Sequence, residues 1–113
     1  MYFKFDSRLG IELPDFPTTF EELPHPDQEA VLLRWETIRA AIPDQIFRFE
    51  RAIEDCLEIV HHEEDWDEIA LQFDHIADYA SRIHDLNMWR RVDPSLPHPP
   101  EHSVSQEHRD REK

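Results

Sequence analysis

The chain has 113 residues, the length of a single domain, and carries 26 acidic residues against 12 lysines and arginines, a formal net charge of −14. Nucleic acids and anionic membrane surfaces repel so acidic a protein, because both bind through a basic footprint. One cysteine excludes an internal disulfide and suits a reducing compartment. No apolar run approaches the roughly 18 residues of a membrane span. We therefore expect a soluble cytoplasmic protein that binds neither nucleic acid nor membrane directly.

Glycine is nearly absent, since Gly10 is the only one in the chain. Phosphate-binding loops and the G-x-S-x-G nucleophile elbow need several glycines at fixed spacing, so the sequence excludes those classes of enzyme. Tight hairpin turns also favour glycine, which argues against an all-β domain.

Residues 1–26 are predicted to form an irregular arm that lays its aromatic side chains across a helical core. A short extended stretch near the start has the composition of a strand. Thr18-Thr19-Phe20-Glu21 fits a capping box that opens one helical turn, which Pro24 ends. The first long helix is predicted over about 27–41, with an apolar stripe formed by Val31, Trp35, Ile38 and Ile42.

Two further helices are predicted over about 43–62 and 66–91. Apolar residues alternate at three- and four-residue spacing in both, through Ile46, Phe49, Ile53, Cys56 and Val60 in the first and Trp66, Ile69, Phe73, Ile76, Ala80 and Ile83 in the second. The two patterns are out of step, and Asp65 with Glu68 supplies a helix start between them. We predict an all-α bundle built on an antiparallel helical hairpin; one continuous helix is the alternative.

The last segment, residues 93–113, holds four prolines and only two aliphatic residues, Leu96 and Val104. Such a composition cannot offset the entropy of ordering the chain. We therefore predict a single helical domain over 1–92 and a disordered tail over 93–113.

The charge distribution gives the main functional hypothesis. Ten acidic residues and no lysine or arginine lie between Arg51 and Arg82. On a helical hairpin these acids gather at the distal half, where they suit a basic protein partner. The predicted partner-binding residues are Glu58, Glu63, Glu64, Asp65, Asp67 and Glu68.

Metal binding is the alternative hypothesis. Glu58 and His61 form an E-x-x-H pair of the kind found in di-metal carboxylate bundles, and His62 and His75 are nearby candidates. The second helix lacks a matching E-x-x-H motif, however, and Glu58 and His61 point away from the predicted seam. No cofactor is expected.

A second stripe on the last helix, formed by Tyr79, Leu86 and Trp89, is either covered by Trp35 and Ile38 of the first helix or forms a homodimer surface. We expect a homodimer, and we find no catalytic constellation. In plan, the chain is similar to the small acidic helical inhibitors of bacteria, such as nuclease immunity proteins, antitoxins and nucleic-acid mimics. The similarity is one of composition and involves no shared motif. It implies a non-enzymatic regulatory, inhibitor or adaptor protein.

Overall fold

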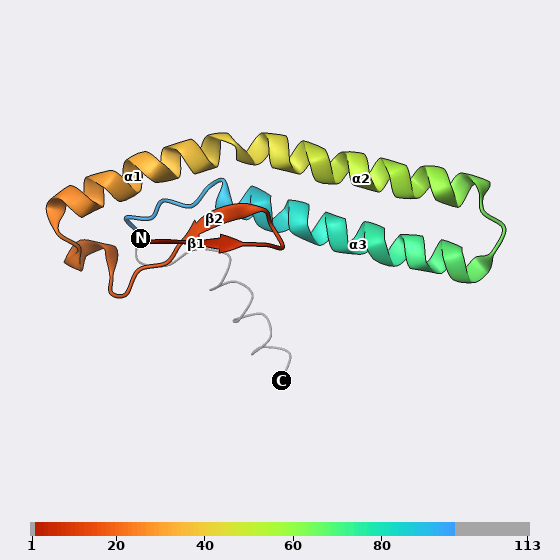
Figure 1. Cartoon of the computed structure of the whole chain (residues 1–113), viewed down its shortest axis with the longest axis horizontal. Coiled ribbons are helices and arrows are strands. Elements are labelled where there is room, and N and C mark those ends of the chain that lie inside the picture. The colour runs from red at the N-terminus through yellow and green to blue at the C-terminus, as the bar shows by residue number, and fades with distance from the viewer. Residues whose placement is uncertain (1, 97–113) are drawn as a thin grey trace.

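The computed structural model describes residues 2–96 of the chain. Helices make up 67% of these described residues. The three long ones are α1 (His25–Ala40), α2 (Ile42–His62) and α3 (Trp66–Trp89) (Figure 1). They are preceded by strands β1 (Phe3–Asp6) and β2 (Ile11–Pro14) and by a short 3-10 helix, η1 (Phe20–Glu22). The all-α class is therefore right for most of the chain, but part of the N-terminal arm is a small antiparallel sheet.

The strands of this sheet form a β-hairpin in which Phe3 pairs with Pro14 and Asp6 with Ile11. Gly10 ends the turn with a φ of +75°, a conformation that side-chain-bearing residues rarely adopt. Its N–H donates to the carbonyl of Asp6 at 2.7 Å. One glycine at the right position is enough for a single hairpin, and the short strand expected near the start of the chain is β1.

Helices α1 and α2 follow one another with only Ala41 between them (Figure 1). Pro43 lies in the first turn of α2, where its missing N–H costs no helical hydrogen bond. Val31, Trp35 and Ile42 are buried, with exposed fractions of 2% or less. The apolar stripe predicted for the first helix is therefore confirmed.

Helices α2 and α3 form an antiparallel hairpin, so the alternative of one continuous helix is wrong. Asp65 caps α3, because its carboxylate accepts the backbone N–H of Asp67 at 2.9 Å. The carboxylate of Glu63 accepts the N–H of Asp65 at 3.1 Å. The predicted capping partner Glu68 instead accepts the side-chain amide of Gln72 at 2.8 Å.

The face of α3 that packs on α2 agrees with the predicted one in part, because Ile69, Ile76 and Ile83 lie on the buried side but the other predicted seam residues do not. Trp66 and Phe73, predicted to lie in the seam, are 80% and 51% exposed. The residues that repeat along the buried side are Ile69, Gln72, Ile76, Tyr79, Ile83 and Leu86. Gln72 is buried because its amide is satisfied by Glu68, an arrangement that a count of apolar residues cannot anticipate.

The main core lies where the β-hairpin, α1, the start of α2 and the end of α3 meet. It consists of Leu9, Ile11, Trp35, Ile42, Ile46, Leu86, Trp89 and Val92. The rings of Trp35 and Trp89 pack edge to face at 6.2 Å, and the Trp35 indole donates to the Val92 carbonyl at 2.9 Å. Chain beyond α3 thus contributes to the core.

The segment predicted to be disordered from residue 93 begins with structured chain. Pro94 is buried, and Asp93 accepts hydrogen bonds from the hydroxyl and backbone N–H of Ser95 at 2.7 and 3.0 Å. Residues 93–96 therefore belong to the folded part. Residues 97–113 lie outside the described residues.

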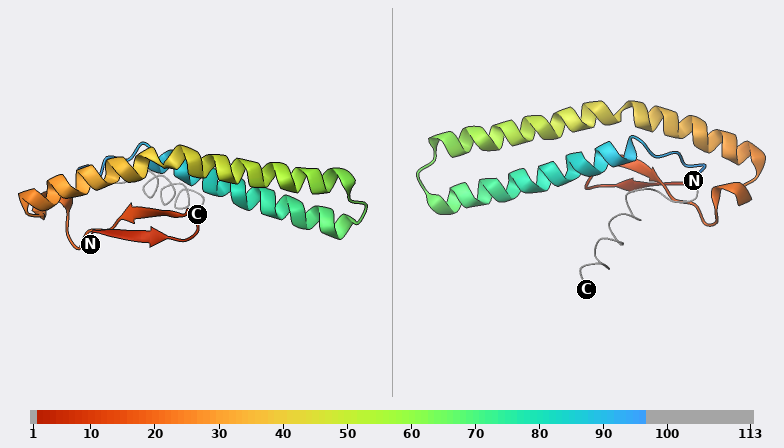
Figure 2. Two further views of the ribbon diagram at one scale, coloured as in Figure 1. Left: turned by 45° about the horizontal axis from the view of Figure 1, so that its top comes forward. Right: turned by 180° about the vertical axis from the view of Figure 1, so that it is seen from behind.

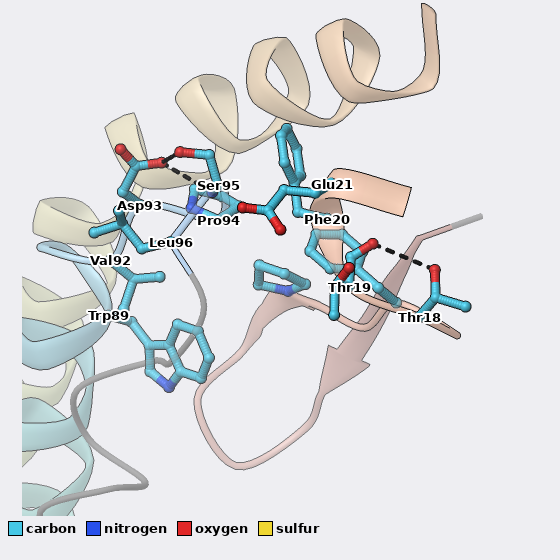
Figure 3. Close-up of a pocket in the computed structure, with 12 residues that line it drawn as sticks. Thr18, Thr19, Phe20, Glu21, Trp89, Val92, Asp93, Pro94, Ser95 and Leu96 are labelled. Carbon is cyan, nitrogen blue, oxygen red and sulfur yellow. Dashed lines mark hydrogen bonds between the residues drawn. The ribbon is translucent and has the colours of Figure 1, made fainter. Parts of the chain in front are cut away.

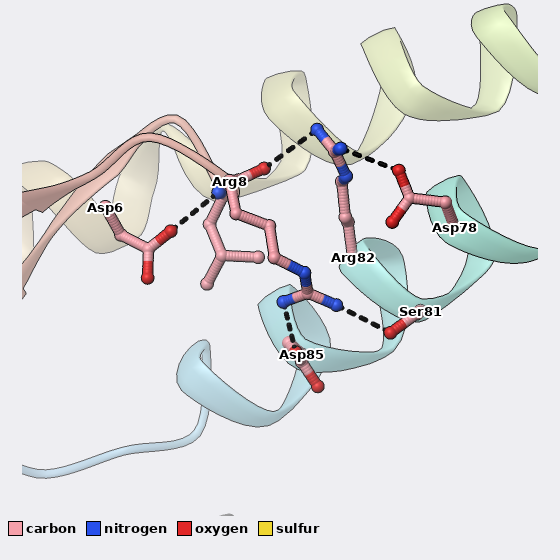
Figure 4. A network of polar contacts seen from close by, with 7 residues as sticks. Asp6, Arg8, Asp78, Ser81, Arg82 and Asp85 are labelled. Atoms are coloured by element: carbon pink, nitrogen blue, oxygen red, sulfur yellow. Dashed lines mark hydrogen bonds and ion pairs between the residues drawn. The ribbon is translucent and has the colours of Figure 1, made fainter. Parts of the chain in front are cut away.

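The β-hairpin covers one side of the helical layer (Figure 2). Its turn is fixed to the helices by side chains: Arg8 bonds to the carboxylate of Asp85 at 2.6 Å, and Arg82 donates to the carbonyl of Arg8 at 3.2 Å (Figure 4). From α2, the amide of Gln45 donates to the carbonyl of Leu9 at 3.0 Å. These contacts define which side of α2 and α3 the hairpin occupies.

Candidate functional site

Beyond the turn of the β-hairpin, α2 and α3 continue as a two-helix arm (Figures 1 and 2). We define the distal arm as residues 52–81. Its charge is −10, since it holds ten acids and no lysine or arginine: Glu54, Asp55, Glu58, Glu63, Glu64, Asp65, Asp67, Glu68, Asp74 and Asp78. All except Glu63 and Glu68 are exposed. The arm therefore carries most of the net negative charge of the chain.

The six acids predicted to bind a partner all lie in this arm: Glu58, Glu63, Glu64, Asp65, Asp67 and Glu68. Glu63 and Asp65 shape the turn before α3, and Glu68 bonds to Gln72. Within residues 2–96, the side chains of Glu64 and Asp67 form no hydrogen bond or ion pair. These two are the predicted acids that a partner would meet without breaking a local contact.

The predicted metal ligands are not brought together. Glu58 bonds to His62 at 2.8 Å, one helical turn on, and not to His61. Both partners of this pair are strongly exposed. In the described part of the chain, no three histidine, cysteine, aspartate or glutamate side chains, His75 included, gather as a metal site.

Exposed apolar residues on α3 form a row that the β-hairpin does not cover. Trp66, Ala70, Phe73, Ala77 and Ala80 repeat at four- and three-residue spacing, so they share one side of the helix. A different row, Leu71, His75, Asp78, Arg82 and Asp85, ends at the residues that hold the hairpin. The seam with α2 lies between the two rows.

Helix α2 shows the same division into two sides. The row that begins at Gln45, which bonds to the hairpin, continues through Arg48, Ala52, Asp55 and Ile59. The row on the other side of the seam contains Phe47, Glu50, Glu54, Leu57 and His61. We call the side made by this row and by the Trp66-to-Ala80 row the open face, because the hairpin lies on the opposite side.

The residues predicted as an oligomer surface are Tyr79, Leu86 and Trp89, and the structure gives them another role. Leu86 and Trp89 are 0% and 6% exposed, because they pack in the core with Trp35 and Ile38. Tyr79 is half-buried, with its ring 5.8 Å from that of Phe49. Leu86 and Trp89 are therefore covered within the chain, in a core that includes Trp35 and Ile38 of α1, whereas Tyr79 packs against Phe49 of α2.

A pocket of 240 Å³ lies between η1 and the segment after α3 (Figure 3). Its walls are mainly apolar and include Phe16, Phe20 and Trp89. Two carboxylates line the pocket, Glu21 and Asp93, and the hydrogen bonds from Ser95 hold the pKa of Asp93 below its ordinary value. The Asp93 carboxylate already accepts the hydroxyl and the backbone N–H of Ser95.

No protein-family model matches the chain, and no match was found among curated proteins or solved structures. No helix within residues 2–96 is long and apolar enough to cross a membrane. Function therefore has to be inferred from the charge and the exposed faces of the distal arm.

Proposed function

We propose that the chain is a non-enzymatic protein that binds a basic protein partner through its distal arm and modulates that partner. The observation that carries the proposal is the combination, on one two-helix arm, of a charge of −10 with exposed large apolar side chains. Exposed aromatic groups anchor protein interfaces, and the surrounding charge selects the sign of the partner.

The charge on the arm has an energetic cost that a partner relieves. Ten carboxylates on two neighbouring helices repel one another, and no lysine or arginine of the arm compensates them. Arg82, just beyond the arm, pairs with Asp78 at 2.6 Å but lies on the hairpin side. A cationic surface placed against the arm replaces this repulsion by attraction and accelerates encounter at low salt.

The two other candidate functions have less support. A metal-binding bundle would need Glu58, His61, His62 and His75 to converge, and they do not do so in the described structure. For a homodimer, the candidate surface on α3 consists of Tyr79, Leu86 and Trp89, of which the last two are buried within one chain. A dimer joined through the arms would also bring two charges of −10 together.

Charge reversal tests the proposal. The probe is a synthetic 21-residue helical peptide of three heptads, with Leu at positions a and d and Lys at positions e and g. The test variant is Glu64→Lys with Asp67→Lys, because neither side chain forms a hydrogen bond or ion pair within residues 2–96. The matched control is Glu21→Lys with Glu22→Lys, two exposed acids of η1 outside the arm.

Stopped-flow association at low salt should be several-fold slower for the arm variant than for the parent, and nearly unchanged for the control. The difference should shrink at about 1 M salt, where the screening length falls to roughly 3 Å. Equal association rates for the parent and both variants at low salt would overturn the proposal. Circular dichroism checks that each variant keeps the helical content of the parent.

A further inference from the structure

We propose that the open face is a docking site for one basic amphipathic helix of the partner, which completes a three-helix bundle with α2 and α3. The inference rests on the proposed function and adds the face, the shape and the chemistry of what binds. The observations that carry it are the exposed apolar row on α3 and the exposed acids that flank this row.

The apolar row has the pattern of a helix-packing surface. Trp66 and Phe73 are seven residues apart and 80% and 51% exposed, and the exposed small residues Ala70, Ala77 and Ala80 lie between and after them. Small side chains at this spacing let a neighbouring helix approach closely, and the large ones provide anchors. The row extends over roughly 21 Å, which is two heptads of a bound helix.

The acidic residues beside the apolar row determine which charge a docked helix must carry. Glu50 and Glu54 line the open side of α2, and Asp67 and Asp74 directly follow Trp66 and Phe73 on α3. All four carboxylates are exposed. Lys or Arg beside the apolar stripe of a docked helix would face them, in the way that e and g positions pair in coiled coils.

A second copy of this chain fits the open face poorly. Its own open face carries the same acids, so the contact would set like charges against each other. The large exposed apolar side chains of the open face are Phe47, Leu57, Trp66 and Phe73, and one docked basic helix covers them without bringing a second set of carboxylates against the face. A helix of opposite charge therefore fits the open face better than a second copy of the chain does.

The opposite side of the arm offers an internal control. Leu71 is 46% exposed, close to the 51% of Phe73, and lies two residues away in the row that leads to the β-hairpin. Truncation of either side chain removes a comparable exposed apolar group. Only the truncation of Phe73 alters the open face.

Calorimetry with the same Lys–Leu heptad peptide tests the inference at low salt. Phe73→Ala should weaken binding at least tenfold, and Leu71→Ala less than twofold. A scrambled peptide of the same composition, which has the charge but no apolar stripe, should bind at least tenfold more weakly than the heptad peptide. Equal losses for Phe73→Ala and Leu71→Ala would overturn the assignment to the open face.

Failure of the inference can be told from failure of the proposed function. If the scrambled peptide binds as tightly as the heptad peptide, charge alone drives binding; the docking site is then wrong and the proposed function stands. If neither basic peptide binds at low salt, both are wrong. If light scattering shows a dimer that Phe73→Ala dissociates, a second copy occupies the open face and the inference is overturned.

Discussion

Replacing Gly10 by alanine tests how the β-hairpin is fixed to the helices and thus why one side of α2 and α3 is covered. A positive φ costs a residue with a side chain about 1–2 kcal/mol. The added Cβ would clash with the side-chain amide of Gln45, which donates to the carbonyl of Leu9 at 3.0 Å. Gln45 is flexible and moves aside, but it then loses this hydrogen bond, a net contribution of about 1 kcal/mol. We expect the free energy of unfolding to fall by about 2–3 kcal/mol.

Urea denaturation followed by circular dichroism measures this loss. In a Gln45→Ala background the hydrogen bond is already absent, so Gly10→Ala should cost only the backbone contribution of about 1–2 kcal/mol. The two substitutions should therefore be non-additive. A loss below about 0.5 kcal/mol in the parent, or the same loss in both backgrounds, would refute the reasoning.

Leu86→Ala should lower the free energy of unfolding by about 2–5 kcal/mol, because Leu86 is 0% exposed. Phe73→Ala should lower it by less than about 1 kcal/mol, because Phe73 is 51% exposed. Similar losses for the two variants in urea titrations would contradict the burial of Leu86. Ser95→Ala removes part of the interaction that lowers the pKa of Asp93. A carboxyl whose pKa is lowered on folding stabilises the fold above its ordinary pKa of about 3.9, and this stabilisation is lost as the pH falls through the folded value. Ser95→Ala should therefore cost a few tenths of a kcal/mol at about pH 6 and nothing at about pH 2, and a thermal-melt difference that persists in acid would contradict the assignment.

Local signals in the sequence predicted the helical hairpin and its charge. Asp65 is a helix-capping residue, and the apolar patterns on its two sides are out of step, so a turn was expected where the structure has one. The absence of lysine and arginine between Arg51 and Arg82 can be read from the sequence alone. This stretch becomes an acidic arm once the chain folds back at residues 63–65. Both inferences rest on neighbouring residues and need no knowledge of distant contacts.

Contacts between distant residues explain what could not be predicted. Trp89 is buried because Trp35, more than fifty residues earlier, packs against it, and the spacing within α3 contains no sign of that contact. The side of Phe73 was also misassigned, because Gln72 occupies the seam once Glu68 satisfies its amide. The row from Trp66 to Ala80 is visible in the sequence at helical spacing, but only the packing of α3 on α2 shows that it lies outside the seam, and only the contacts of the β-hairpin show that it is on the side away from the hairpin.

The emission of Trp66 tests binding at the open face most directly. The chain has three tryptophans; Trp66 is 80% exposed, whereas Trp35 and Trp89 are 2% and 6% exposed. The Lys–Leu heptad peptide should shift the emission to the blue and protect it from acrylamide quenching, and Trp66→Phe should abolish both changes. Unchanged emission and quenching at peptide concentrations that saturate binding in calorimetry would contradict docking on this face.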